Sequence, residues 1–336
     1  MKRLAWALGL AGLALVIALV ARTGARSVLD AFALAGWPLL ALLPLHVLPL
    51  ALDAGNWRVL LAPRDPARRA GLPVLMLVAA VREAVNRLLP VAGIGGELVG
   101  IRIVVRLGVP AAATAASVLV EVVLTLVSLV LFALLGLLLL GSQGRGGPSS
   151  AQSLWVGLAL AAPIPIAGLW AVHRGRLAAP LAWLGTRLSG AAGLSTAWLS
   201  SIPAFQEELA LLAARPARLG LATLLILLGM SAGAIEVGVA LRLLGHPATA
   251  AASLALEAIV LFVRNLAFAV PAGLGAQEAG IVLVGAALGI PADIALGLAL
   301  AKRMREVLFG VPALAGWHLW ETFARRTRRS APPDAP

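Results

Sequence analysis

Several features of a soluble enzyme are missing from this sequence. It has no cysteine, which excludes disulfides, thiolate metal sites and cysteine nucleophiles. No phosphate-binding loop of the type G-x-x-x-x-G-K-S/T is present. The histidines are too scattered for paired zinc ligands, at His46, His173, His246 and His318. No hydrophilic stretch is long enough for a separate catalytic domain, so we expect no metal, no cofactor, no catalytic residues and no enzymatic activity.

Charged residues are scarce as well. They make up 12% of the 336 residues, hydrophobic residues make up 61%, and the mean hydropathy is +0.97. Because a soluble globular protein is only about 45–50% apolar, the composition predicts an all-α, polytopic membrane protein. The net charge of +12 fits positive-inside topology and contact with anionic head groups. We expect membrane lipids as partners and no nucleic acid, because no soluble basic face exists to bind it.

Long apolar runs follow one another along the chain. Each run of roughly 20 apolar residues is long enough for one membrane-spanning helix. The expected full spans lie at about 4–21, 34–61, 112–140, 153–172, 218–244 and 292–321. Two further apolar segments, 71–110 and 249–291, are interrupted by charges, proline and glycine. Non-helical backbone at membrane depth must be buried in protein or line a cavity, so we predict two re-entrant helical hairpins besides about six full spans, about eight membrane elements by hydropathy.

The chain reads as a single membrane domain over residues 1–336. We expect repeat one at about 34–140, a cytoplasmic interfacial linker at about 173–217, repeat two at about 218–321 and a basic disordered tail at 322–336. Lys2 and Arg3 precede the first apolar run, which we take as a retained helix and not a cleaved signal, and arginines fill the tail. The positive-inside rule then places both termini in the cytoplasm, with the protein in the cytoplasmic (inner) membrane.

One motif occurs twice at a constant offset. The stretch Pro90–Glu97 (PVAGIGGE) returns as Pro271–Glu278 (PAGLGAQE), and Leu107–Pro110 (LGVP) returns as Leu288–Pro291 (LGIP). Between the two copies lies an odd number of expected crossings, so the copies should have opposite orientations. Inverted repeats with broken helices are typical of secondary transporters.

Charged side chains concentrate around these two motifs. A charge near the centre of a membrane helix costs about 2.5–3.5 kcal/mol on insertion scales, so such residues pair with one another or face a cavity. We predict a polar pocket between the hairpins that binds a lipid head group, with half-helix N-termini and arginines as anion ligands and Glu278 as a candidate proton carrier. The candidate substrate-binding residues are Arg82, Glu83, Asn86, Arg87, Glu97, Glu257, Arg264, Asn265, Glu278, Lys302 and Arg303. The alternative is that these residues form internal salt bridges without a ligand.

These residues also carry a family resemblance. The segments Asn86–Glu97, Arg264–Asn265 and Val270–Glu278, together with Glu257 and the Lys302–Arg303 pair, resemble the flippase-like integral membrane family that includes the transmembrane part of lysylphosphatidylglycerol synthases. The nearest branch is the one associated with hopanoid biosynthesis, and the likeness covers about 35–321. It implies a lipid flippase-like domain. The soluble aminoacyl-transfer domain of those synthases has no counterpart in this chain, so we expect that activity to be absent.

Three classes of function remain open at this point. The first is a lipid flippase or transporter that moves a polar or anionic lipid between leaflets, with a hopanoid-related lipid as one candidate substrate. The second is a non-catalytic scaffold that binds lipid-biosynthesis enzymes through residues 173–217. The third is an intramembrane enzyme that acts on a lipid head group. The DedA-like membrane proteins, another family with inverted hairpins, are an architectural alternative.

Overall fold

The structure is a computed structural model. It describes residues 36–89, 95–142, 155–159, 162–173, 202–267 and 275–329, together with residue 33. Within these residues every regular element is a helix and there is no strand, which confirms the predicted all-α membrane protein. The expected first span, most of the linker and the tips of both hairpins lie outside the described residues.

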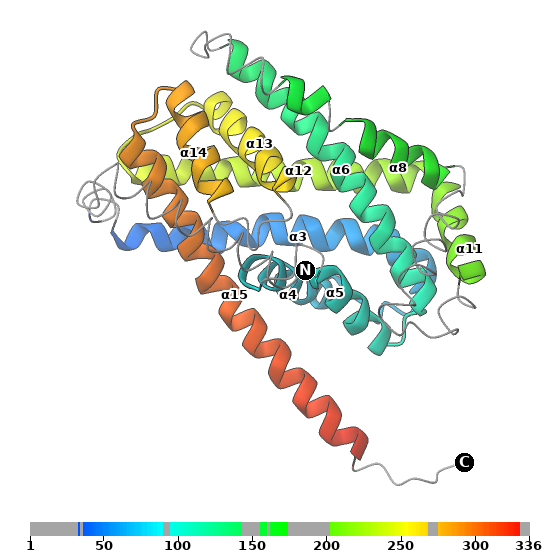
Figure 1. The fold of residues 1–336 in the computed structure, drawn as a ribbon. Helices are drawn as coiled ribbons and strands as arrows, with labels where there is room; N and C mark the ends of the chain where they lie inside the picture. The colour runs from blue at the N-terminus through cyan, green and yellow to red at the C-terminus, as the bar shows by residue number, and fades with distance from the viewer. Residues whose placement is uncertain are drawn as a thin grey trace, which may run out of the picture.

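The described helices fall into two halves joined by shorter helices (Figure 1). The first half contains η1 (Trp37–Ala41), α3 (Leu42–Leu61), η2 (Ala62–Arg64), α4 (Leu72–Leu88), α5 (Gly95–Arg106) and α6 (Ala111–Ser142). The joining part contains α8 (Pro163–His173) and α11 (Ile202–Ala213). The second half contains α12 (Pro216–Leu243), α13 (Ala250–Leu266), α14 (Ala276–Ala287) and α15 (Ala292–Arg329).

Three of the expected spans are confirmed by length and composition. Among the described residues, the helical segments long and apolar enough to cross a membrane are Trp37–Arg64, Ala111–Gly141 and Pro216–Leu243. A fourth expected span, 292–321, is one continuous helix that carries several charges near its middle. The count of six spans stays a prediction, because the remaining two expected spans lie wholly or partly outside the described residues.

The last helix differs from its predicted length. We expected a disordered tail from residue 322, yet α15 continues to Arg329 and projects beyond the rest of the molecule (Figure 1). The four arginines of the expected tail did not stop it, because arginine is a good helix former. The sequence signal for the tail was its charge, and charge alone does not end a helix.

The two hairpins have matched dimensions. Helices α4 and α13 both contain 17 residues, and α5 and α14 both contain 12. At 1.5 Å per residue these helices are about 26 Å and 18 Å long, shorter than the hydrocarbon core of about 30 Å. Each copy therefore has two helices that are separated by an interruption, as predicted, but the first of them is longer than the half-length helix that we expected. Their re-entrant placement in a membrane stays a prediction.

The turn after each hairpin repeats in atomic detail. Gly108 and Gly289 both adopt positive φ, +93° and +77°, which a side chain would disfavour. The amides of Val109 and Ile290 then donate back to carbonyls five residues earlier, at 3.4 and 2.8 Å. This is the hydrogen-bond pattern of a Schellman cap. Because the same cap ends both copies at an offset of 181 residues, the duplication seen in the sequence is present in the fold.

The two halves pack reciprocally and in opposite directions. Helix α3 lies along α12, α4 packs on α15, and α13 packs on α6 (Figure 1). At one end of the α3–α12 pair, Arg218 Nη1 donates to the carbonyl of Val59 at 3.1 Å. At the other end His46 contacts Glu236. The early part of each helix therefore meets the late part of the other, so α3 and α12 are antiparallel and the repeat is inverted.

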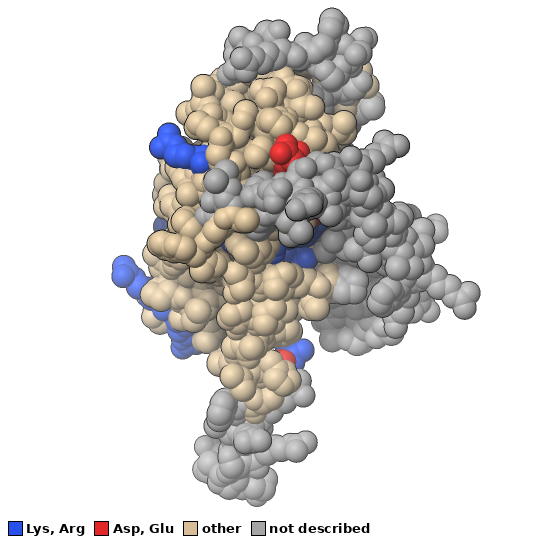
Figure 2. All heavy atoms as spheres, turned by 90° about the vertical axis from the view of Figure 1, so that its left-hand side faces the viewer, with Lys and Arg blue, Asp and Glu red and all other residues tan. Residues whose placement is uncertain are grey.

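Apolar side chains fill the interior and also cover much of the outside. One buried cluster centres on Leu256, Ile259 and Leu296, and another on Trp57 and Val104. The face seen in Figure 2 is dominated by uncharged residues, with only small separate groups of charge in its described part. Such a surface suits contact with lipid chains, while the charges described below lie between the helices.

Candidate functional site

The buried charges form two groups, one within the first repeat and one at the seam between the two repeats. We define the Arg82 cluster as Asn56, Trp57, Arg82, Asn86, Glu97 and Glu121. We define the central network as His46, Glu83, Arg87, Glu236, Glu257, Arg264, Gln277, Glu278, Lys302, Arg303, Arg305 and Glu306. The central network joins residues from α3, α4, α12, α13, α14 and α15.

The Arg82 cluster is an arginine held by two carboxylates. Arg82 Nη1 and Nη2 each donate to one oxygen of Glu121 at 3.1 Å, and Nε donates to Glu97 Oε2 at 2.7 Å. The guanidinium carbon lies 4.7 Å from the ring centre of Trp57. Arg82 and Glu121 are both buried. Such a pair is costly to desolvate, and it is stable only while every partner stays in place.

Glycines on α5 make room for this cluster. A Cβ atom on Gly96 would clash with the carbonyl oxygen of Arg82 and approach Asn86 Nδ2 to 2.7 Å. A Cβ atom on Gly100 would lie 2.8 Å from Arg82 Cδ. Close contact between α4 and α5 thus depends on the absence of side chains at these two glycines.

The N-termini of both second half-helices are already capped. In the first hairpin the amide of Gly96 donates to Asn86 Oδ1 at 2.8 Å. In the second hairpin the amide of Gly275 donates to Glu278 Oε2 at 2.8 Å, the returning half of a capping box. We expected these N–H groups to face an anionic ligand. At Gly96 and Gly275 that expectation is wrong, because a side chain of the same hairpin satisfies each amide.

Glu306 is the point where both hairpins meet α15. Its Oε2 accepts from Arg303 Nη1 at 2.8 Å and its Oε1 accepts from Arg264 Nη1 at 3.3 Å. Arg87 Nε, from the end of α4, lies 3.9 Å from Oε1. The Glu306 side chain has no exposed surface. A single carboxylate therefore neutralises arginines from α4, α13 and its own helix.

His46 links the two long helices of the inverted pair to α4. Its Nδ1 lies 3.0 Å from Glu236 Oε1 on α12, and its Nε2 lies 2.8 Å from Glu83 Oε2 on α4. Arg305 pairs with the other oxygen of Glu236. The edge of Phe309 packs on the imidazole, with ring centres 5.3 Å apart. Across the described residues no group of histidine and carboxylate side chains is arranged to hold a metal ion.

A small cationic cavity opens inside the central network. It has a volume of about 30 Å3 and is lined by Arg87, Glu257, Val260, Leu261, Arg264, Gln277, Lys302 and Arg305. Four of these side chains are cationic and one is a carboxylate, which pairs with Lys302. Gln277 Nε2 and Arg305 Nε are buried and lack a hydrogen-bond partner in the described part of the chain. The cavity has room for about one water-sized group, and its lining favours an acceptor with negative charge.

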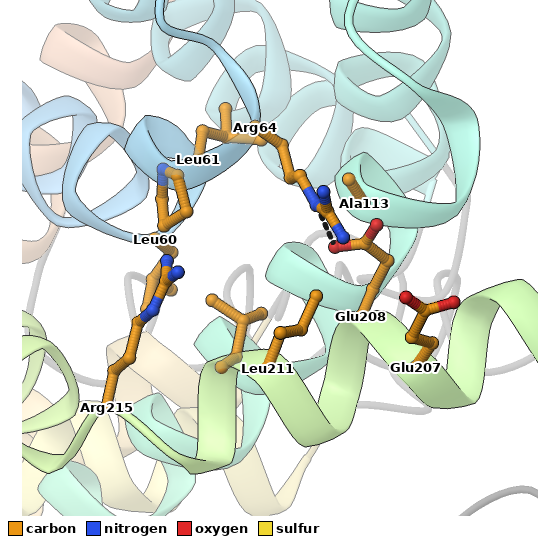
Figure 3. A pocket seen from close by; sticks show the side chains of 10 residues that line it. Leu60, Leu61, Arg64, Ala113, Glu207, Glu208, Leu211 and Arg215 are labelled. Atoms are coloured by element: carbon orange, nitrogen blue, oxygen red, sulfur yellow. Dashed lines mark hydrogen bonds and ion pairs between the residues drawn. The ribbon is translucent and has the colours of Figure 1, made fainter.

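A second pocket lies away from the network, where the end of α3, the start of α6 and α11 meet (Figure 3). Its volume is about 160 Å3. Leu60, Leu211 and Leu212 contribute an apolar floor. Arg64 Nε donates to Glu208 Oε2 at 2.8 Å on one side of it, while Arg215 reaches toward Leu60 on the other.

The structure brings most of the predicted residues together. Four of them, Arg87, Glu257, Arg264 and Lys302, line the cavity. Glu83, Glu278 and Arg303 belong to the central network around it, and Arg82, Asn86 and Glu97 form the neighbouring cluster. Asn265 is apart: its side chain is exposed and donates to the carbonyl of Leu261 on its own helix. Ligand binding by these residues stays a prediction.

Sequence reasoning missed several members of the two clusters. These are His46, Glu121, Glu236, Gln277, Arg305 and Glu306. All except Gln277 are ionisable residues within apolar helices, which is itself the signal that marks functional candidates in a membrane protein. Gln277 lies at the position equivalent to Gly96, so comparing the two copies residue by residue would have found it.

Comparison with known families shows to which family the chain belongs. The family model described as the lysylphosphatidylglycerol synthase transmembrane region matches residues 5–314. The chain belongs to this family. Its members are membrane proteins of lipid-related function, and the match covers both repeats and both clusters. Curated proteins and solved structures gave no match. The hopanoid-associated branch of the lysylphosphatidylglycerol synthase transmembrane-region family stays a prediction.

Proposed function

We propose that this protein is a lipid flippase that moves a lipid with an anionic or polar head group between the leaflets of the cytoplasmic membrane. The observation that carries the proposal is the cationic cavity at the seam of the inverted repeat. In this proposal both termini are cytoplasmic, the hairpins are re-entrant, and no chemical bond of the lipid is changed.

The lining of the cavity suits a phosphate or carboxylate oxygen. Arginine binds such groups through paired N–H donors, and Arg87 and Arg264 approach the cavity from the two hairpins. Gln277 Nε2 and Arg305 Nε supply donors that find no acceptor among the described residues. A buried donor without an acceptor costs about 1–3 kcal/mol. A bound anionic oxygen would remove that cost.

The inverted packing supports movement between two sides. In transporters built this way the binding site stays near the midplane, while one repeat rocks against the other and opens the site alternately. A cavity of about 30 Å3 cannot hold a whole head group, so in this proposal the site must widen before a lipid enters. Opening must separate Arg87 from Glu306 or Arg264 from Glu306, since these contacts join the hairpins to α15.

The test is lipid exchange in proteoliposomes that contain purified protein. Fluorescent phosphatidylglycerol, phosphatidylcholine and a polar hopanoid are each followed by quenching from outside. We expect fast exchange of an anionic or polar lipid with wild type and slow exchange with Arg264→Gln. The matched control is Arg242→Gln, which changes an exposed arginine outside both clusters and should behave as wild type. Wild-type liposomes that exchange no lipid of the panel would overturn the proposal.

One observation favours a second function, a scaffold for lipid-biosynthesis enzymes. The pocket of about 160 Å3 beside α11 has an apolar floor with charged residues around it, as a docking site for a partner would need. A scaffold would lose partner recovery when Leu211→Arg is introduced and would keep it with Arg264→Gln. If the protein is a flippase, Arg264→Gln should slow lipid exchange and Leu211→Arg should leave it unchanged.

A further inference from the structure

His46 lies between two carboxylates that approach opposite edges of its ring. Nε2 is 2.8 Å from Glu83 Oε2 and Nδ1 is 3.0 Å from Glu236 Oε1. The His46 and Glu236 side chains are 8% and 5% exposed, and that of Glu83 is 24% exposed. Both separations are within the normal range for hydrogen bonds. This triad therefore makes two hydrogen bonds at once.

The two hydrogen bonds require one proton more than a neutral imidazole carries. A neutral imidazole has one N–H donor and one lone pair, and an ionised carboxylate only accepts. Neutral His46 beside two ionised glutamates would set a lone pair against a lone pair at one of the two contacts. The geometry needs an extra proton, either on the second ring nitrogen or on one of the two glutamates.

Within the described part of the chain, each glutamate of the triad is held by an arginine. The groups that face it are Glu83 and Arg87 from α4, Glu236 from α12, and Arg305 and Phe309 from α15. Arg305 pairs with the far oxygen of Glu236. Arg87 Nε lies 3.7 Å from the far oxygen of Glu83. Each carboxylate is thus oriented by an arginine and presents its other oxygen to the histidine.

The triad lies between helices that must move relative to one another if one repeat rocks against the other. It ties α3 to α12, the antiparallel pair, and ties α3 to α4, the first helix of a hairpin. Pro49 lies inside α3 one turn after His46 and removes a backbone hydrogen bond there. Without the extra proton, either the His46–Glu83 contact or the His46–Glu236 contact would lack a hydrogen bond. The link between α3 and the helix on that side would then be weaker, next to the proline.

We propose that His46, Glu83 and Glu236 form a single-proton binding site through which lipid movement is coupled to a proton gradient. This inference rests on the proposed function, because it names the coupling ion of the flippase. It replaces Glu278 in that role. Both oxygens of Glu278 are already occupied, one in the cap of α14 and one in the ion pair with Arg303.

The proton site can be tested without transport. Nitrogen NMR of the purified protein, with histidine labelled, distinguishes a protonated from an unprotonated ring nitrogen, and His46→Gln assigns the signal. We expect His46 to carry protons on both nitrogens, or on one nitrogen with a protonated glutamate visible in the infrared carboxyl band that Glu83→Gln or Glu236→Gln removes. A neutral His46 without a protonated carboxyl would overturn the site.

Coupling is tested in the same proteoliposomes with an imposed pH difference. One proton per lipid and a tenfold proton gradient sustain a lipid gradient of about tenfold. We expect wild type to build such a gradient, and His46→Gln to exchange lipid without responding to pH. Glu83→Gln gives a second, independent variant should His46→Gln fold poorly. His318→Gln is the matched control, since His318 is exposed and lies outside the central network.

The outcomes separate the two proposals. Wild type that exchanges lipid but ignores the pH difference overturns proton coupling and leaves the flippase in place. Wild type that exchanges no lipid overturns the flippase and the coupling with it, while the NMR result still decides whether the triad binds a proton. A His46→Gln protein that keeps the full pH response overturns the assignment of coupling to this triad.

Discussion

The hairpin α4–α5 and the hairpin α13–α14 share lengths, turns and a glutamate at the third position of the second helix, but they anchor that glutamate differently. Glu97 pairs with Arg82 from its own hairpin. Glu278 caps its own helix and pairs with Arg303 from α15. The backbone of the duplication is thus the same in both copies, because it depends on local caps and glycine turns. The ion pairs differ, because they depend on what packs against each copy.

This difference gives the two hairpins different roles. The first hairpin neutralises its buried arginine with its own glutamate and with Glu121 of the following helix. The second hairpin contributes Arg264 and Gln277 to the cavity wall, where Arg264 Nη1 donates to Gln277 Oε1 at 2.7 Å, and the carboxylate that pairs with Arg264 is Glu306 of α15. We infer that the first hairpin is the more rigid element. The second is tied to the rest of the protein through contacts that a ligand could replace.

The largest expected effect comes from removing the arginine of the first hairpin. Arg82→Met leaves Glu97 and buried Glu121 without a cation, and breaking a buried pair in this way costs about 3–5 kcal/mol. Arg303→Met in α15, which removes the cation paired with Glu278 of the second hairpin, should cost less, because Glu306 keeps Arg264 as a partner. Thermal unfolding of both variants in detergent measures the difference. Equal losses would contradict the view that the first hairpin is tied internally.

The next effect distinguishes Gly96 from its equivalent, Gln277. A Cβ atom on Gly96 has no room beside Arg82, so Gly96→Ala should destabilise the protein by about 1–3 kcal/mol through overpacking. Gln277→Ala removes the acceptor of a buried 2.7 Å hydrogen bond from Arg264 Nη1 and should therefore also cost about 1–3 kcal/mol of stability. In addition it should slow the exchange of anionic lipid about tenfold, since a hydrogen bond to a charged group is worth about 1.4 kcal/mol or more. If Gly96→Ala slows lipid exchange as much as Gln277→Ala does, the two hairpins are functionally equivalent and our distinction is wrong.

A smaller effect should separate the two equivalent glutamates. The amide in Glu278→Gln can still cap the helix, but it leaves Arg303 without one of its carboxylates, and the Glu278 side chain is only 2% exposed. The Glu97→Gln change leaves Arg82 with both oxygens of Glu121, and the Glu97 side chain is 20% exposed. We expect a loss of about 1.5–3 kcal/mol for Glu278→Gln and about half of that for Glu97→Gln. Chemical denaturation of the two variants measures both losses in the free energy of unfolding. A larger loss for Glu97→Gln than for Glu278→Gln would show that burial does not govern the cost.

The smallest effect is expected outside both hairpins. Arg64 and Glu208 form an ion pair beside α11, where the Arg64 side chain is 41% exposed. Water and salt screen such a pair, so Arg64→Ala should leave the unfolding temperature within experimental error of wild type. This variant provides the baseline for the hairpin comparisons. A large shift would mean that the contact between η2 and α11 holds the two halves together more than the buried network does.

Much of the architecture could be predicted from the order of residues. Apolar runs located the three spans that the structure confirms, and the offset of 181 residues located both hairpins and the turns that follow them. Such features are local: a span depends on about 20 neighbouring residues, and a Schellman turn on fewer. The end of α15 was predicted too early, because charge marks a solvated segment but carries no stop signal for a helix.

The pairing of the buried charges was decided only by the tertiary structure. His46 and Glu236 are 190 residues apart, and Arg82 and Glu121 are 39 apart, with several other carboxylates available to each cation. Sequence reasoning named the charged candidates around both motifs, since isolated charges in apolar helices stand out. Which carboxylate meets which arginine depends on the rotation of each helix and on the side that it turns to its neighbour. That choice is made when α3 packs along α12 and when α4 and α13 pack against α15 and α6, because only this packing removes the charges from lipid and brings each one to a partner.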